Sequence, residues 1–171
     1  MCKRDRREHR KFDTRMHGCG GSWGSTLSLS YAIAYPSHVR SLILRGIFLC
    51  RKKDLDFFYQ GNAATFAQDR FDMSLPGAYM QYPEAWEKFV KVIPENERHD
   101  MIAAYDRLFS RSPKTPTDIE YQNEAARAWS SWEGSTSYLA PHPDSLDEYE
   151  KLSFAKAFAR IENQYSVSDP H

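Results

Sequence analysis

The sequence predicts an α/β fold in which helices dominate, and three observations lead to this class. A run of the form G-x-S-x-G covers residues 20–24. Such a run is typical of a serine held on a sharp turn between a strand and a helix. A short apolar run at residues 39–46, bounded by proline and glycine, predicts a buried strand. After residue 48 the pattern is mainly helical, so we expect a small sheet followed by a helical layer.

Length and charge limit the number of domains and the kinds of partner. The chain has 171 residues, 41% hydrophobic and 27% charged, which suits one globular domain rather than two full ones. The net charge is zero, but residues 1–18 hold seven of the 23 basic and three of the 23 acidic residues. This excess predicts a solvated basic arm or an arm that touches nucleic acid. Because Phe12 is its one interleaved aromatic, we expect no nucleic-acid partner.

The sequence predicts a cytoplasmic protein without a membrane partner or a cofactor. No stretch of about 18 apolar residues is present, and no apolar run follows the basic N-terminus as in a secretory signal. Cys2, Cys19 and Cys50 form neither a disulfide framework nor a set with metal-ligand spacing. We therefore expect no metal and no organic cofactor, and the oligomeric state stays open.

The first quarter of the chain predicts one helix and one good strand. Residues 1–17 show neither a strand period nor a helix period, so we expect an irregular arm without a buried strand before the serine. Residues 23–35 are small and apolar and end at Pro36, which predicts a helix packed on a sheet. Helix and strand then form an α/β unit with a right-handed crossover. The glycines of the motif are expected to leave room for these neighbours.

The remaining sequence predicts five helices separated by prolines. Their expected ranges are 54–60, 83–92, 95–110, 118–139 and 147–165. Thr117 before Asp118 resembles a capping box, and Ser145 resembles a second helix start. No further strand and no internal repeat is expected.

Five runs of sequence carry a family resemblance by their order and spacing. They are GGSWGSTL at 20–27, LRGIFL at 44–49, FFYQ at 57–60, AWSSWEG at 128–134 and FARIEN at 158–163. Together they resemble the proline iminopeptidases (prolyl aminopeptidases) of the α/β-hydrolase superfamily. The resemblance implies a serine exopeptidase that releases N-terminal proline from peptides, with a helical cap over the sheet.

This resemblance divides the chain into four segments. We expect an irregular basic arm at 1–18, a partial α/β-hydrolase core with the nucleophile elbow at 19–50, a helical cap domain at 51–165 and a tail at 166–171. The implied partner is a peptide with an N-terminal proline.

The resemblance makes Ser22 the nucleophile that attacks the scissile carbonyl and gives Trp23 an oxyanion-stabilising backbone N–H. From spacing alone, Ser22 could equally be a solvated loop serine. A serine hydrolase also needs a base and an orienting acid, which in this superfamily follow the serine as Asp and then His. His171, the last residue, follows no strand, and His17, His38, His99 and His142 stand in other contexts. We therefore expect impaired turnover in a truncated chain.

The resemblance assigns the substrate's α-amine to two carboxylates. Glu133 lies four residues after Trp129, and Glu162 lies four residues after Phe158, so each shares a helix face with an aromatic. Carboxylates beside an aromatic wall can pair with a secondary ammonium. From the residues alone, both could be ordinary exposed helix glutamates.

Three more residues are implied at the substrate. Phe48 would pack against the pyrrolidine ring, or it is a core residue at a strand end. Phe58 stands where some relatives carry tyrosine, and Arg45 could pair with the glutamates or face solvent. Two other functions stay open: a non-catalytic fragment that keeps the amine-binding cap, and another α/β-hydrolase such as an esterase.

Overall fold

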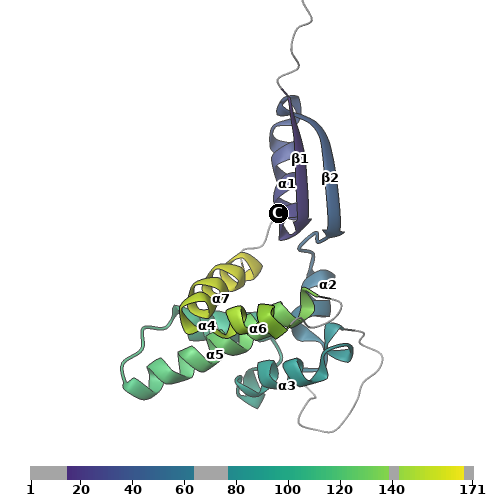
Figure 1. Cartoon of the computed structure of the whole chain (residues 1–171). Helices are drawn as coiled ribbons and strands as arrows, with labels where there is room; N and C mark the ends of the chain where they lie inside the picture. The colour runs from purple at the N-terminus through teal and green to yellow at the C-terminus, as the bar shows by residue number, and fades with distance from the viewer. Residues whose placement is uncertain (1–14, 64–76, 139–142, 168–171) are drawn as a thin grey trace, which may run out of the picture. The chain divides into compact units, whose positions relative to one another are not determined.

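The protein forms two compact units, residues 1–49 and residues 50–171. A computed structural model describes residues 15–63, 77–138 and 143–167 of the chain (Figure 1). Within these ranges no helix is both long enough and apolar enough to cross a membrane.

The first unit is a strand–helix–strand arrangement. It consists of β1 (Met16–Ser22), α1 (Trp23–Ala34), the 3₁₀ turn η1 (Pro36–His38) and β2 (Val39–Ile47). The strands pair in parallel, with Gly18 opposite Leu42 and Gly20 opposite Leu44. Helix α1 packs against both strands (Figure 1). The predicted helix and the strand at 39–46 are therefore confirmed as elements, but the prediction that this strand is buried is wrong, because each residue of β2 is exposed or half-buried.

Strand β1 corrects the expectation of an irregular arm up to residue 17 or 18. It begins at Met16 and leads directly into Ser22, whereas residues 1–14 lie outside the described residues. No apolar run predicted it, because Gly18, Gly20 and Gly21 occupy three of its seven positions, and of these Gly20 faces α1. A Cβ on Gly20 would lie 2.6 Å from Ser28 Oγ and even closer to the carbonyl oxygen of Gly24. The helix can approach the strand at Gly20 because this residue has no side chain.

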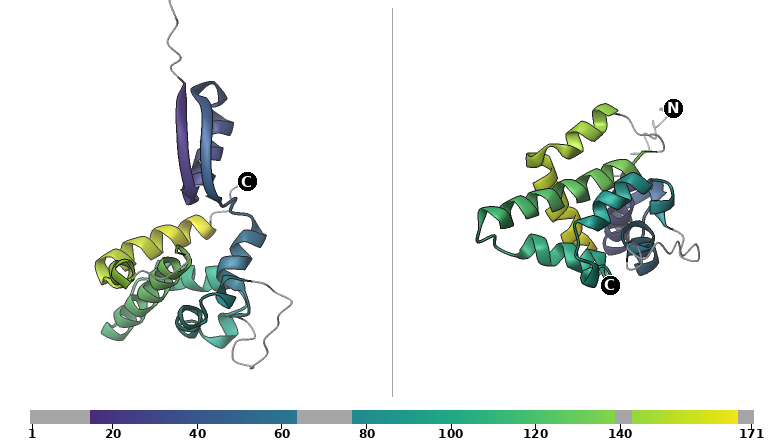
Figure 2. Two further views of the ribbon diagram at one scale, coloured as in Figure 1. Left: turned by 45° about the vertical axis from the view of Figure 1, so that its right-hand side comes forward. Right: turned by 90° about the horizontal axis from the view of Figure 1, so that it is seen from below.

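In the described residues of the second unit, every secondary-structure element is a helix or a helical turn. In chain order it has α2 (Lys52–Leu55), the π-helical turn η2 (Asp56–Gln60), η4 (Ala78–Met80), α3 (Pro83–Lys91), η5 (Glu95–Glu97), α4 (Met101–Ser110), α5 (Pro116–Thr136), α6 (Pro143–Glu150) and α7 (Leu152–Val167). The long helix α5 contacts α3, α4, α6 and α7 (Figure 2).

Two predicted helices are in fact divided. The range 95–110 splits into η5 and α4, and the range 147–165 is divided by Lys151 between α6 and α7. The Lys151 carbonyl accepts the Ala155 N–H at 2.8 Å and so begins α7. Side chains on both sides of each break share a helical period, which hides the break in the sequence.

Two predicted helix starts also shift. The capping box of α5 uses Thr115, not Thr117: Thr115 Oγ1 accepts from Asp118 N at 3.1 Å, and Asp118 accepts from Thr115 N. Helix α6 begins at Pro143 instead of after Ser145. In both helices proline occupies the first turn, where its missing N–H costs nothing.

An aromatic core holds the helices of the second unit together. Trp86, Phe89, Tyr105, Trp129 and Trp132 are all buried. Phe89 stacks on Tyr105 with ring centroids 4.8 Å apart, and Trp86 lies 5.1 Å from Trp132. Such aromatic pairs add to the free energy of area burial. The core therefore fixes the part of α5 from which Glu133 projects.

Candidate functional site

Ser22 lies at the junction where β1 ends and α1 begins. Its backbone has φ 52° and ψ −124°, a conformation that a residue with a Cβ rarely adopts, and its side chain is exposed. Such strain persists only where surrounding structure holds it. A strained serine with an exposed hydroxyl between strand and helix matches the mechanics of a nucleophile elbow.

Two buried hydroxyl groups hold this turn, and sequence reasoning missed both. Ser25 Oγ donates to the Ser22 carbonyl at 2.6 Å and accepts from the Phe48 N–H at 3.0 Å. Thr26 Oγ1 donates to the Phe48 carbonyl at 2.6 Å. The turn is thereby tied to the residue that follows β2. The sequence feature that could have indicated these two hydroxyl groups is the Ser-Thr pair directly after the motif.

The surroundings of Ser22 include two aromatic rings and a cation. The rings of Trp23 and Phe48 lie 6.3 Å apart, so the first unit brings these two predicted site residues together. Trp23 opens α1, and the start of a helix favours negative charge on nearby groups. The exposed Arg45 side chain covers Gly21, where an added Cβ would lie 3.1 Å from Cζ.

The three described histidines have their contacts away from Ser22. These contacts are His17 Nδ1 with Ser41 Oγ at 2.6 Å, His38 stacked on Tyr35 at 5.7 Å, and His99 Nδ1 with the Asn96 carbonyl at 3.0 Å. His142 and His171 lie outside the described residues. Within the described ranges, therefore, no histidine is hydrogen-bonded to the serine.

In the second unit, Glu133 is bonded to a tyrosine that sequence reasoning did not name. Glu133 lies on α5 and is half-buried, and its Oε1 accepts a hydrogen bond from the Tyr59 hydroxyl. Tyr59 is buried in η2, and its ring stacks on Trp129 at 5.1 Å. Glu162, on α7, is also half-buried. The sequence placed Tyr59 in the FFYQ run but gave no signal for its bond to Glu133, because 74 residues separate the two.

Burial dominates the electrostatics of this carboxylate pair. It raises the pKa of Glu133 to about 7; the Tyr59 hydrogen bond acts to lower that pKa, and the negative charge of Glu162 raises it. Burial also raises the pKa of Glu162. A bound cation would lower the pKa of both carboxyl groups, because it favours the ionised form of each. The pair is therefore suited to a cationic group.

Phe58 belongs to the same π-helical turn as Tyr59. Its ring meets Phe57 edge-on at 5.3 Å, and its carbonyl accepts from Trp132 Nε1 at 3.1 Å. The side chain is half-buried, so part of it can contact a ligand. Its predicted role beside a pyrrolidine ring stays a prediction, as do those of Phe48 and Arg45.

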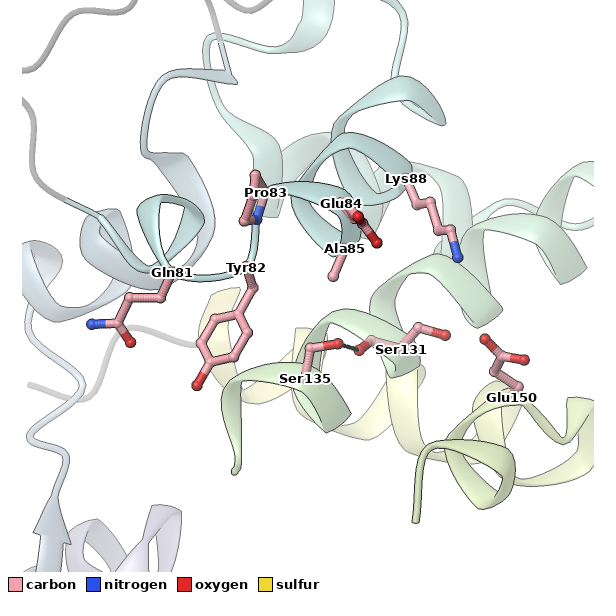
Figure 3. Close-up of a pocket in the computed structure, with 9 residues that line it drawn as sticks. All are labelled: Gln81, Tyr82, Pro83, Glu84, Ala85, Lys88, Ser131, Ser135 and Glu150. Carbon is pink, nitrogen blue, oxygen red and sulfur yellow. Dashed lines mark hydrogen bonds between the residues drawn. The ribbon is translucent and has the colours of Figure 1, made fainter. Parts of the chain in front are cut away.

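A separate groove of about 400 Å³ lies on the second unit. Figure 3 shows its lining by α3, α5 and α6, with Ser131 and Ser135 on α5 and with Lys88 and Glu150 near one end. Neither Glu133 nor Glu162 lines this groove. Among the described residues, no cluster of three His, Cys, Asp or Glu side chains could hold a metal ion.

Comparison with known proteins gives one consistent name. No family model matches the chain. The chain is 45% identical over 150 residues to a proline iminopeptidase of Arabidopsis thaliana, a match that covers 87% of this chain and 34% of the relative. It is 43% identical over 155 residues to that of Xylella fastidiosa (strain 9a5c), with 91% and 43% covered.

A third relative, the probable proline iminopeptidase of Leptolyngbya boryana, is 43% identical over 162 residues, with 95% of this chain and 44% of the relative covered. This chain thus spans between 34% and 44% of the length of these curated relatives. The resemblance inferred from five motifs is confirmed.

Proposed function

Because this chain is a homologue of part of the proline iminopeptidases, we propose that it takes part in the hydrolysis that releases N-terminal proline from peptides. The observation that carries the proposal is the backbone of Ser22, strained at φ 52° on the turn from strand to helix. An ordinary loop serine has no need of this conformation, whereas an exposed nucleophile does.

In the proposed reaction, Ser22 Oγ attacks the carbonyl carbon of the N-terminal prolyl residue. The oxyanion that forms is stabilised by the Trp23 backbone N–H at the start of α1. The C–N bond breaks as the nitrogen of the leaving peptide receives the proton that was taken from Ser22, and water then hydrolyses the prolyl ester on Ser22 to release proline. The base that takes the serine proton is proposed to lie outside the described residues, since the described histidines have other contacts.

Glu133 and Glu162 are proposed to recognise the ammonium group of the proline. Two half-buried carboxylates near aromatic rings favour a cation over a neutral group. This preference supports an aminopeptidase over an esterase, because a neutral ester needs no anionic partner.

Replacement of the nucleophile tests the proposal. The chain is assayed for release of arylamine from a prolyl-arylamide, with a leucyl-arylamide as the substrate control. We expect any prolyl-specific release to fall by at least about 1000-fold in Ser22→Ala, in line with the loss of a nucleophile in other serine hydrolases. Release that survives this substitution would show that Ser22 is not the nucleophile.

A second candidate function is amine binding without turnover. It is favoured by the intact Tyr59–Glu133 bond together with the lack of a described histidine on Ser22. Calorimetry with prolinamide separates the two candidates. Binding without release of arylamine supports the second, and Glu133→Gln should then weaken the binding.

A further inference from the structure

The hydrogen bond between Tyr59 and Glu133 joins two segments that are far apart in the chain. Tyr59 is only 6% exposed, so its hydroxyl has little access to water. The bond goes to Oε1 of Glu133. A buried hydroxyl bonded to a carboxyl favours the ionised form and restricts the rotation of that group.

The fold fixes Tyr59 independently of Glu133. Within the same turn, Gln60 Nε2 donates to the Arg98 carbonyl at 2.9 Å, and Gln60 Oε1 accepts from Met101 N at 3.1 Å, at the start of α4. Trp132 Nε1 ties the turn to α5 through the Phe58 carbonyl. The ring of Tyr59 stacks on Trp129 at 5.1 Å. The tyrosine therefore orients the glutamate, and not the reverse.

The second carboxyl oxygen of Glu133 is in a different situation. No donor among the described residues is hydrogen-bonded to Oε2, while Oε1 is engaged by the tyrosine. The side chain keeps part of its surface open to solvent. The nearby charge in this unit is that of Glu162 on α7, which repels an anion and attracts a cation.

We propose that Tyr59 is a positioning residue: it holds Oε1 of Glu133 so that Oε2 is presented to the secondary ammonium of a bound prolyl group. This inference rests on the proposed function for its ligand. Without the hydroxyl, the carboxyl rotates freely and keeps its proton to higher pH, so it binds an ammonium less well. The Tyr59 hydroxyl itself does not contact the ligand.

The test compares Tyr59→Phe with Tyr105→Phe. Both variants keep a stacked ring in the same core, and both lose one buried hydroxyl. In Tyr105 that hydroxyl donates to the Phe89 carbonyl at 2.7 Å, away from Glu133. The other groups whose charges interact with Glu133, Glu162 on α7 and Tyr149 on α6, stay unchanged in both variants.

We expect Tyr59→Phe to bind prolinamide roughly tenfold more weakly at pH 7, as for loss of a hydrogen bond to a charged group. The difference in prolinamide affinity between Tyr59→Phe and the parent protein should be smaller at pH 8.5. Tyr105→Phe should bind prolinamide as tightly as the parent protein. Adding Tyr59→Phe to Glu133→Gln should change nothing further. Near-ultraviolet circular dichroism checks that each variant is folded.

A second measurement does not need a ligand. The side-chain carboxyl carbon of Glu133 is followed by NMR through a pH titration. Its midpoint should move upward in Tyr59→Phe and stay in place in Tyr105→Phe. An unmoved midpoint in Tyr59→Phe overturns the inference. If the Glu133 titration midpoint moves in Tyr59→Phe but the parent protein binds no prolinamide, Tyr59 does position Glu133. In that case the proposed recognition of the amine is overturned.

Discussion

The carboxyl group of Glu133 is subject to opposing influences, and burial is the largest of them. Burial and the charge of Glu162 favour the protonated form, whereas the Tyr59 hydrogen bond favours the ionised one. The resulting pKa of about 7 lies above the ordinary value of 4.5, so Glu133 holds a proton in the folded protein at pH values where it has lost it in the unfolded chain.

This difference predicts a pH-dependent stability. Because the folded protein binds a proton on Glu133 more tightly than the unfolded chain does, protonation of Glu133 adds to the free energy of unfolding. This added stability is complete below pH 4.5 and is lost as the pH rises through 7. The loss amounts to about 3 kcal/mol. Urea unfolding of the parent protein and of Glu133→Gln at pH 5 and pH 8 measures it, and the variant should lose less stability between the two.

Glu124→Gln is the control, because Glu124 is exposed on the same helix. It should lose as much stability as the parent protein between pH 5 and pH 8. An equal loss in Glu133→Gln would contradict the raised pKa.

At the scale of single residues, the sequence predicted chemical types better than contacts. The motif predicted that Ser22 stands on a strand-to-helix turn, and the structure places it there. Tyr59 and Ser25 were missed because their partners, Glu133 and Phe48, lie 74 and 23 residues away. Local spacing carries no information on such pairs.

At the scale of the elements, the packing around the turn at Ser22 requires a glycine at position 20 but not at position 24. A Cβ on Gly20 would meet α1, whereas a Cβ on Gly24 would meet nothing within 4 Å. The expectation that both glycines leave room for neighbours is therefore wrong for Gly24. Gly24 lies on α1, and a Cβ added there has open space around it.

The two glycines thus form a matched pair of substitutions. We expect Gly20→Ala to destabilise the first unit by about 1–3 kcal/mol, because backbone atoms must move. Gly24→Ala should be neutral or stabilising by up to about 1 kcal/mol, since alanine favours a helix. Amide hydrogen exchange in β1 and α1 measures both effects. Equal protection in the two variants would contradict the close approach of α1 to β1.

Strand β2 and the helices were predictable as elements, but β1 and the helix breaks were not. An apolar run marks β2, whereas the glycines of β1 remove that signal. Lys151 ends one helix and starts the next with no glycine or proline at the break. The helices on both sides of this boundary, α6 and α7, pack on α5.

At the scale of the whole molecule, the two units differ in what holds them together. Every buried hydrophobic residue in the described ranges belongs to the second unit. In the first unit the buried side chains are those of Ser25 and Thr26, while Ile33, Ile43 and Ile47 are more than half exposed. A parallel sheet of two strands has two open edges and little apolar burial of its own.

This contrast predicts that the units open with different free energies. Amides of β1 and β2 should exchange with solvent faster than those of α5, whose side chains Trp129 and Trp132 lie in the aromatic core. Hydrogen exchange followed by mass spectrometry on the intact chain measures this difference. Urea should narrow it, because opening of the second unit exposes its buried aromatic core and its opening free energy therefore falls more steeply with urea. Equal protection of β2 and α5 at every urea concentration would mean that both units unfold as one cooperative structure.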